Sequence, residues 1–354
     1  MLKELDGFRA VAVSMVVLFH LGFYTSAIPG LNEVVGAGYL GVQIFFILSS
    51  FLLARQYLLY YPQSADKKEY TFNFFKKRIL RILPLYLFSS IILSIPVYKQ
   101  LDLSLLNVVQ YLLFIKDNLQ VNVVIWSLFV EVRFYILLPI LMAGMFYLSG
   151  YKRAAMYVIP VVVILYSYLY RYLELTINTR DAASAERLYS SLSANIDCLG
   201  LGIIAAMIYE RYKQTVLKST IVITVTCLLL ACIFGIMYIQ YHKLHTIINK
   251  VLVPLNNVLW TAAIVVVMLG KTTFFNKILS SKVAVYISML SYSIYLWHLP
   301  IRLACVQLLH NLLKNGNEKY IMLSQFVLTI LLTWLVSAIS YRYVEKPFLK
   351  KKMA

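Results

Sequence analysis

Residues 38–60 read GYLGVQIFFILSSFLLARQYLLY, an apolar run in which Arg55 is the only charged side chain. A helix needs about 20 predominantly apolar residues to cross the hydrocarbon core of a bilayer, whereas a transmembrane barrel strand needs only about 10. The length of this run therefore predicts a membrane-spanning helix. Similar runs occupy nine further segments: 8–26, 79–98, 123–148, 154–171, 194–210, 219–240, 251–270, 286–309 and 320–342.

These segments predict an all-α, polytopic helical membrane protein with about ten transmembrane helices. The run 103–116 is shorter and interrupted by polar residues, so we interpret it as an interfacial or re-entrant piece. Short linkers join the predicted helices, and the longest lies around residues 171–193. We expect residues 1–354 to form a single transmembrane domain, with no fused soluble domain.

The composition excludes a water-soluble protein. Of the 354 residues, 61% are hydrophobic and only 14% are charged, whereas soluble domains carry roughly a quarter charged residues. A water-soluble fold of this size could not bury such an apolar excess, because folding leaves much of the surface exposed. We therefore expect a multi-pass protein of the cell membrane, in contact with lipid.

The formal net charge of +18 indicates membrane orientation rather than nucleic-acid binding. Lys and Arg gather in the short loops between apolar runs, and most of them lie on the side that would hold both termini. Because basic loops stay on the inner side of a membrane, both termini are expected to be cytoplasmic. The four cysteines form no CxxC pair, so neither a metal site nor a disulfide framework is predicted: Cys198, Cys227, Cys232 and Cys305.

Arg9 and His20 lie on the first predicted span, eleven residues apart. Eleven steps of a helix end about 20° past three full turns, so both side chains share one face, separated by a rise of roughly 16 Å. This arrangement suits a long anionic ligand. Arg9 would hold its charged end at the cytoplasmic surface, and its far end would reach the buried imidazole of His20. The alternative is a snorkelling arginine and a histidine that hydrogen-bonds to a neighbouring helix.

Glu131 and His298 are two further ionisable residues inside predicted spans, where charge is costly and usually functional. Either side chain could orient His20 or contact a substrate. Glu131 is not expected to pair with Arg133, because residues two apart on a helix point to different faces. Pro300 is expected to kink the helix that carries His298 and to free a backbone carbonyl.

Arg78 and Arg81 are three residues apart, at the predicted start of the span 79–98. They therefore share a helix face, and guanidinium groups at a helix N-terminus suit a phosphate group. The alternative is ordinary anchoring of the helix at the cytoplasmic surface.

Six segments contain motifs that follow one another along the chain: LDGFRA (5–10) followed by His20, GYLGVQIFFILSSFL (38–52), the block of Arg78, Arg81, Pro84 and Tyr86, WSLFVEVRFYILLP (126–139), SYSIYLWH (291–298) and EKP (345–347). Together they resemble membrane acyltransferase family 3 over essentially the whole chain. Two positions depart from the family pattern. Ser50 replaces the usual glycine of the second-helix motif, and Lys77 stands where paired arginines are common.

The resemblance implies an O-acyltransferase that moves an acyl group, most often acetyl, from acyl-coenzyme A to a hydroxyl of a cell-surface or lipid-linked carbohydrate. It implies that His20 is the central catalytic residue and that Arg9 supports donor binding or the catalytic geometry. Arg78 and Arg81 would face the coenzyme, and we add Lys77 and Ser49 to this predicted donor site. No tightly bound cofactor is expected, since acyl-coenzyme A is a substrate.

The acceptor site is predicted in the outer halves of the spans. Trp126 could stack on a sugar, and Asp197 and Asn195 could hydrogen-bond to hydroxyl groups. The alternatives are an interfacial tryptophan anchor and ordinary helix-start residues. The alternative function is a proton-coupled exporter of polysaccharide or lipid-linked sugar, because buried histidines and a glutamate also suit proton transport. The acceptor sugar and the oligomeric state stay open.

Overall fold

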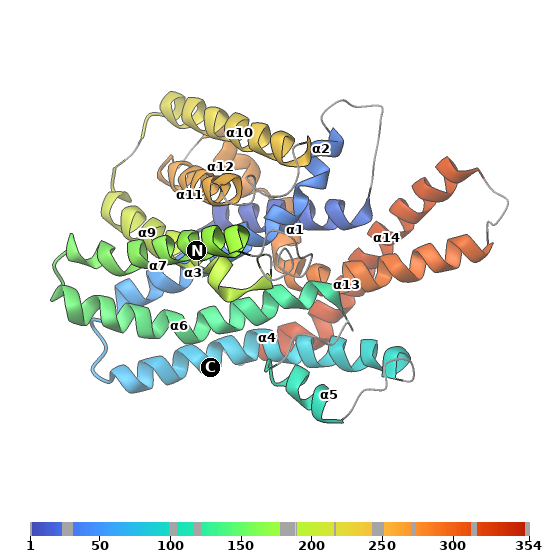
Figure 1. Cartoon of the computed structure of the whole chain (residues 1–354), viewed down its shortest axis with the longest axis horizontal. Helices are drawn as coiled ribbons and strands as arrows, with labels where there is room; N and C mark the ends of the chain where they lie inside the picture. The colour runs from blue at the N-terminus through green and yellow to red at the C-terminus, as the bar shows by residue number, and fades with distance from the viewer. Residues whose placement is uncertain are drawn as a thin grey trace.

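The computed structural model describes residues 2–22, 31–98, 105–115, 122–177, 188, 190–215, 217–242, 251–270, 273–312 and 317–350, and these contain helices and no strand. Figure 1 shows long helices that run side by side. The longer helices are α1 (Lys3–Leu21), α3 (Gly41–Tyr60), α4 (Lys67–Tyr98), α6 (Trp126–Ser149), α7 (Val158–Ile177), α9 (Leu192–Tyr212), α10 (Ser219–His242), α11 (Val253–Leu269), α13 (Lys282–Leu312) and α14 (Glu318–Ser340). The shorter ones are α2 (Leu31–Gly36), η1 (Gly38–Leu40), α5 (Leu105–Leu112), η2 (Val123–Ile125), η3 (Ala155–Tyr157), α12 (Phe274–Leu279), η5 (Tyr341–Glu345) and α15 (Lys346–Lys350).

Each of the ten predicted spans overlaps one of the longer helices. Six helical segments of the described chain are long and apolar enough to cross a membrane: 38–60, 123–149, 155–176, 192–212, 219–239 and 320–349. The helical fold and several membrane-crossing helices are thus confirmed, while the number of ten and the cytoplasmic termini stay predictions. The piece 103–116 contains the short helix α5, as its length indicated.

Two predicted boundaries are wrong for identifiable reasons. The first span was expected to reach residue 26, but α1 ends at Leu21, because Gly22 adopts a left-handed backbone conformation with φ 61°. The third span was expected to begin at residue 79, but helix α4 begins at Lys67. Asp66 caps it, because its carboxylate accepts hydrogen bonds from the backbone N–H groups of Lys68 (2.7 Å) and Glu69 (3.0 Å). Residues 78 and 81 therefore lie about three turns inside α4, not at its N-terminus.

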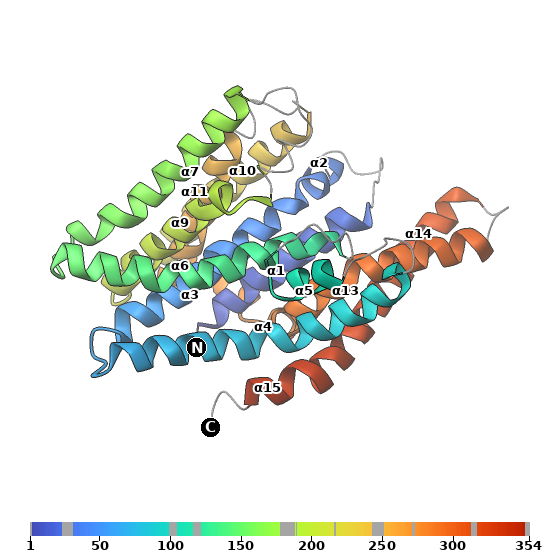
Figure 2. The same cartoon turned by 60° about the horizontal axis from the view of Figure 1, so that its bottom comes forward.

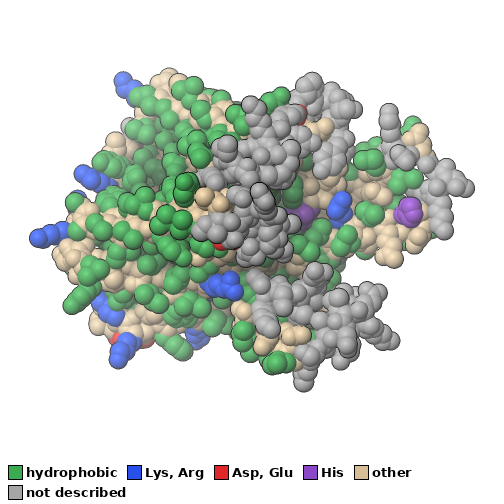
Figure 3. Space-filling model, in the orientation of Figure 1, with side chains coloured by type: hydrophobic (Ala, Val, Ile, Leu, Met, Phe, Trp, Pro, Cys, Tyr) green, Lys and Arg blue, Asp and Glu red, His purple; other side chains and the backbone are tan. Residues whose placement is uncertain are grey.

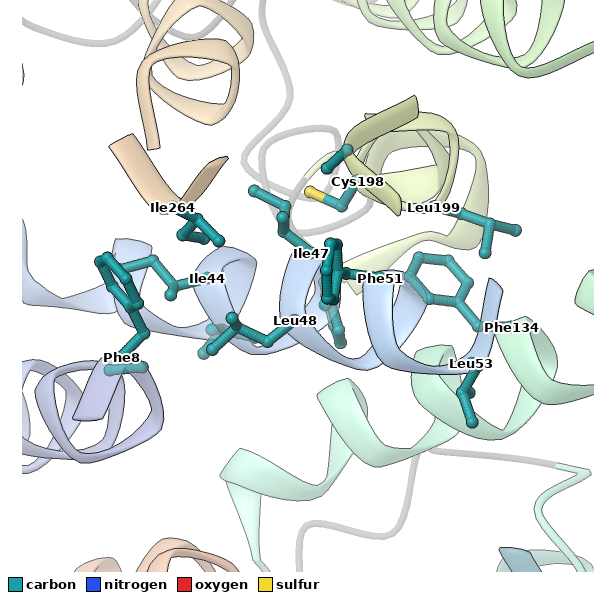
Figure 4. Packing of buried hydrophobic residues seen from close by; sticks show 14 of the residues in the cluster. Phe8, Ile44, Ile47, Leu48, Phe51, Leu53, Phe134, Cys198, Leu199 and Ile264 are labelled. Atoms are coloured by element: carbon teal, nitrogen blue, oxygen red, sulfur yellow. The ribbon is translucent and has the colours of Figure 1, made fainter. Parts of the chain in front are cut away.

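Helix α3 forms the centre of the bundle and packs against α1, α6, α9 and α11. Figure 4 shows its side chains meeting Phe8 of α1, Phe134 of α6, Leu199 of α9 and Ile264 of α11. Ser50, which replaces the usual glycine of the second-helix motif, lies where α3 contacts α9. There the Ser50 hydroxyl donates to the Leu199 carbonyl (2.7 Å).

Small residues allow α3 to approach its neighbours closely. A Cβ atom on Gly202 of α9 would lie 2.5 Å from the Ser50 side chain, and one on Gly41 would lie 2.4 Å from the Ala12 carbonyl oxygen of α1. Neither distance is possible for a real Cβ atom, so only glycine fits at these two positions. The serine in place of the family's glycine thus keeps a close helix contact, because glycine stands opposite it.

Helix α1 lies between α3 and α13, and α13 pairs with α14 in a hairpin that extends to one side of the bundle (Figures 1 and 2). This arrangement brings the end of α1 to the middle of α13, although the two helices are far apart in the sequence. Pro300 lies inside α13 and cannot donate to the Leu296 carbonyl. The Asn122 side-chain amide donates to that carbonyl instead (2.9 Å), which confirms the expectation of a freed carbonyl.

Hydrophobic side chains cover much of the described surface in Figure 3. Within each of the helical segments 155–176, 219–239 and 320–349, only 17% to 28% of an apolar 18-residue stretch is buried inside the protein. Helices that expose so much apolar surface need a lipid environment.

Candidate active site

A pocket lies between helices α1, α3, α4, α6 and α13, and we call it the arginine pocket because Arg9 and Arg81 line it. It brings together four residues that the sequence analysis selected for function: Arg9, Ser49, Arg81 and Glu131. Its remaining walls are Val42, Phe45, Phe46, Ile82, Ser127, Leu128, Tyr135, Ser291, Tyr292 and Tyr295.

The arginines of the pocket are largely enclosed. The Arg9 side chain is 14% exposed, and its nearest carboxylate, that of Asp6, lies 3.8 Å away. Arg78 does not line the pocket itself: it is buried beside the wall, its guanidinium lies 6.0 Å from the centroid of the Tyr135 ring, and its Nε–H has no hydrogen-bond partner. Arg81 acts electrostatically on both other arginines. Lys77 is exposed and does not line the pocket.

Glu131 is the carboxylate that faces these arginines across the pocket. Its Oε1 accepts hydrogen bonds from the Ser49 hydroxyl (2.9 Å) and the Tyr135 hydroxyl (2.5 Å). It also attracts Arg9 and Arg78 electrostatically. Even with Asp6 beside Arg9, the pocket and its wall carry an excess of positive charge. A cavity of this kind suits an anionic ligand.

His20 and His298 face one another, although 278 positions separate them in the sequence. His298 Nδ1 lies 3.1 Å from the Ile294 carbonyl oxygen, and a carbonyl can only accept, so Nδ1 carries the proton of the neutral ring. His298 Nε2 is then an acceptor, and it lies 3.1 Å from His20 Nδ1. His20 Nδ1, which also lies 3.0 Å from the Val16 carbonyl oxygen, is therefore the donor.

These hydrogen bonds assign the role of each nitrogen of His20. Because Nδ1 carries the proton, Nε2 is the unprotonated nitrogen and can act as a base or a nucleophile. His20 is partly buried and His298 is 1% exposed. His298 thus orients the His20 ring, and His298 and the Val16 carbonyl together fix its tautomer.

Tyr295 connects the histidine pair to the arginine pocket. It lines the pocket, and its ring centroid lies 5.8 Å from that of His298. Its hydroxyl donates to the Val124 carbonyl (3.0 Å) and lies 2.7 Å from the Ser127 hydroxyl, which fixes α13 against the start of α6. The pocket and the histidine pair therefore share one wall.

The three residues predicted to contact an acceptor lie in two places. Trp126 begins α6 and packs against the Phe46 ring of the pocket wall. Asn195 and Asp197 are fully enclosed in α9, where the Asp197 carboxylate lies 3.8 Å from the Arg171 guanidinium. Neither of these α9 residues lines the arginine pocket.

The sequence analysis missed three residues at this site. Tyr135 and Tyr295 fall inside the motifs but were not assigned a role. Arg302 follows His298 by four residues on α13 and acts electrostatically on both histidines. The spacing of four on one helix could have identified Arg302 from the sequence alone. In the described part of the chain, no group of three or more His, Cys, Asp or Glu side chains could hold a metal ion.

Comparison with known proteins identifies the family. The family model described as an acyltransferase domain, that of acyltransferase family 3, matches residues 2–342. O-acetyltransferase OatA of Staphylococcus aureus strain NCTC 8325 is 26% identical over 375 residues, covering 99% of this chain. A putative O-acetyltransferase of S. aureus strain COL is 24% identical over 377 residues, covering 98%.

The chain spans 57% of the length of both of these relatives. No solved structure matches it. Because the family model covers nearly the whole chain, and five of the six motifs contribute residues to one pocket, the protein belongs to acyltransferase family 3.

Proposed function

We propose that the protein is a membrane O-acetyltransferase that takes an acetyl group from cytoplasmic acetyl-coenzyme A and transfers it to a hydroxyl of a cell-surface or lipid-linked carbohydrate. The observation that carries this proposal is a positively charged pocket that shares a wall with an oriented histidine pair. The names of the similar proteins, both O-acetyltransferases, support acetyl as the group transferred.

The arginine pocket fits the donor. Coenzyme A is a long, multiply phosphorylated anion whose thioester lies far from its nucleotide. Guanidinium groups bind phosphate oxygens through charge-assisted hydrogen bonds. Arg78, buried beside the Tyr135 ring of the pocket wall, would add its positive charge to the site. Arg9, Arg81 and the Ser49 hydroxyl would line the path of the pantetheine arm towards Tyr295 and the histidines. Lys77, on the exposed side of α4, would attract the donor from outside the pocket.

His20 would perform the chemistry as a general base. Its Nε2 removes the proton of the acceptor hydroxyl while the hydroxyl oxygen forms a bond to the thioester carbonyl carbon. Collapse of the tetrahedral intermediate breaks the carbon–sulfur bond, and the imidazolium returns the proton to the departing thiolate. In the alternative route, His20 Nε2 takes the acetyl group first and passes it to the acceptor. His298 serves both routes, because it holds the His20 Nδ1 proton.

The exporter alternative has less support. A proton carrier would account for the histidine pair, but it would not need a pocket in which arginines outnumber carboxylates. The proposed function is tested by mass spectrometry of surface glycans from cells with and without the protein. An added mass of one acetyl ester that depends on the protein supports the enzyme, whereas unmodified glycan with altered export supports the transporter.

The double variant Arg78→Ala, Arg81→Ala is expected to raise the KM for acetyl-coenzyme A. Each lost charged hydrogen bond costs about 1.5–3 kcal/mol, which corresponds to a loss of donor affinity of at least tenfold. Steady-state kinetics and donor binding to the purified protein measure this effect. Lys76→Ala is the matched control, because Lys76 is an exposed cation on the same helix. Unchanged donor binding in a folded double variant would remove both arginines from the donor site.

Trp126→Ala is expected to separate the two halves of the reaction. If Trp126 stacks on the acceptor sugar, transfer to glycan should fall by about two- to tenfold, since aromatic contacts contribute about 0.5–1.5 kcal/mol beyond the area that they bury. Binding of acetyl-coenzyme A should stay within about twofold of wild type. A parallel loss of both activities would instead assign Trp126 to the packing of the pocket wall against Phe46.

A further inference from the structure

Arg302 lies one helical turn beyond His298 on α13. Residues four apart share a face of a helix, so the guanidinium stem leaves α13 on the side of the histidine pair. Arg302 acts electrostatically on both His20 and His298, which places its charge near both imidazole rings. It is partly buried and falls inside the predicted span 286–309.

The charge of Arg302 has no counter-ion in the described part of the chain. No described residue forms an ion pair or a hydrogen bond with its guanidinium. Arginines within membrane spans usually pair with an acidic side chain or face a polar cavity, because an isolated charge is costly there. Arg9, for comparison, has Asp6 and Glu131 as nearby carboxylates. A lone guanidinium beside a histidine pair calls for an anionic partner from outside the chain.

The order of residues along α13 shows from which side that partner comes. Ser291, Tyr292 and Tyr295 line the arginine pocket, His298 follows, and Arg302 comes last. Arg302 therefore lies on the opposite side of the histidine pair from the proposed donor pocket. Its rise above His298 is about 6 Å along the helix axis, a separation that a single sugar ring can bridge.

We propose that Arg302 binds a carboxylate or phosphate group of the acceptor, so that the protein acetylates an anionic glycan. This inference rests on the proposed function and specifies its substrate class. The arginine would hold the oxyanion while a neighbouring hydroxyl of the same glycan reaches His20 Nε2. The planar guanidinium suits both oxyanions, because it can donate two parallel hydrogen bonds.

The test compares cells that produce the wild-type protein, Arg302→Gln or Arg302→Lys. Surface glycans are fragmented and separated into neutral and anionic pools, and mass spectrometry locates the acetyl esters. Esters are expected on anionic fragments, and the fragment masses show whether a carboxylate or a phosphate is present. Arg302→Gln should lower ester content by about 10- to 100-fold, and Arg302→Lys should lower it less. Arg342→Gln, which removes an exposed cation in η5, should have no effect.

The second measurement is coenzyme A release from acetyl-coenzyme A by purified protein without glycan. This release should fall far less than glycan transfer in Arg302→Gln, because no acceptor is present and only the electrostatic effect of Arg302 on the histidines is lost. An equal fall in release and in transfer would show that Arg302 acts on the histidines and not on the acceptor, which overturns the inference.

The wild-type result decides the question even if Arg302→Gln fails to fold. Wild-type esters on neutral fragments overturn the inference and leave the proposed function intact. Absence of any protein-dependent ester overturns the proposed function itself, and the inference falls with it.

Discussion

Replacing His20 by Ala is expected to lower the rate of acetyl transfer by about 100-fold or more, because loss of a general base typically costs a factor of 10² to 10⁴. The hydrogen-bond partners of His20 leave Nε2 as its basic nitrogen, and alanine has no group that could replace it. A nucleophilic role predicts a loss at least as large. Coenzyme A release by the purified protein and ester content of surface glycans both measure the effect.

The variant should stay folded, since His20 lies at the end of α1 and is only partly buried. His310→Ala is the matched control, because His310 is an exposed histidine near the end of α13, outside the pocket. Its rate should match that of wild type. Transfer at a near wild-type rate by His20→Ala would exclude both catalytic routes proposed for the histidine pair.

The helical fold was predictable because its determinants are local. Hydrophobic length alone identified all ten segments that the structure folds into long helices. The errors lie where short-range polar contacts decide the ends. Asp66 starts α4 well before its apolar part, and helix α7 continues to Ile177, beyond the predicted end at 171. A window of mean hydropathy is insensitive to such caps and to a polar last turn.

The residues of the candidate site were predictable by type, but their partners were not. Charge inside a span marked His20, Glu131 and His298 as functional candidates, and the sequence left open which of the other two orients His20. The structure gives that contact to His298, while Glu131 binds Ser49 and Tyr135. Such contacts join helices that are distant in the chain, so they depend on packing that helical periodicity does not encode.

Arg171 and Asp197 form a strongly enclosed ion pair. Their contact also joins two helices and could not be predicted from helical periodicity. Arg171 was expected at the edge of a loop, yet it is 4% exposed in α7 and lies 3.8 Å from Asp197 of α9, which is 0% exposed. The Asn257 amide of α11 donates to the other Asp197 oxygen (2.8 Å). The pair and this amide thus connect three helices. The role of Asp197 in acceptor binding stays a prediction. Because its side chain is fully enclosed, we expect a mutation of Asp197 to affect the stability of the protein first.

Each single change in this pair, Arg171→Met or Asp197→Asn, is expected to lower the free energy of unfolding by about 3–5 kcal/mol, because removal of one partner leaves the other charge buried and uncompensated. The double variant removes both charges and should be more stable than either single variant, even though the two losses would add if the residues were independent. Unfolding of the purified protein in mixed detergent micelles gives the three free energies. Arg55 and Glu210 form a matched control pair with greater exposure, 28% and 13%, where single changes should cost about 1 kcal/mol or less. Additive losses at Arg171 and Asp197 would show that the two charges do not stabilise one another.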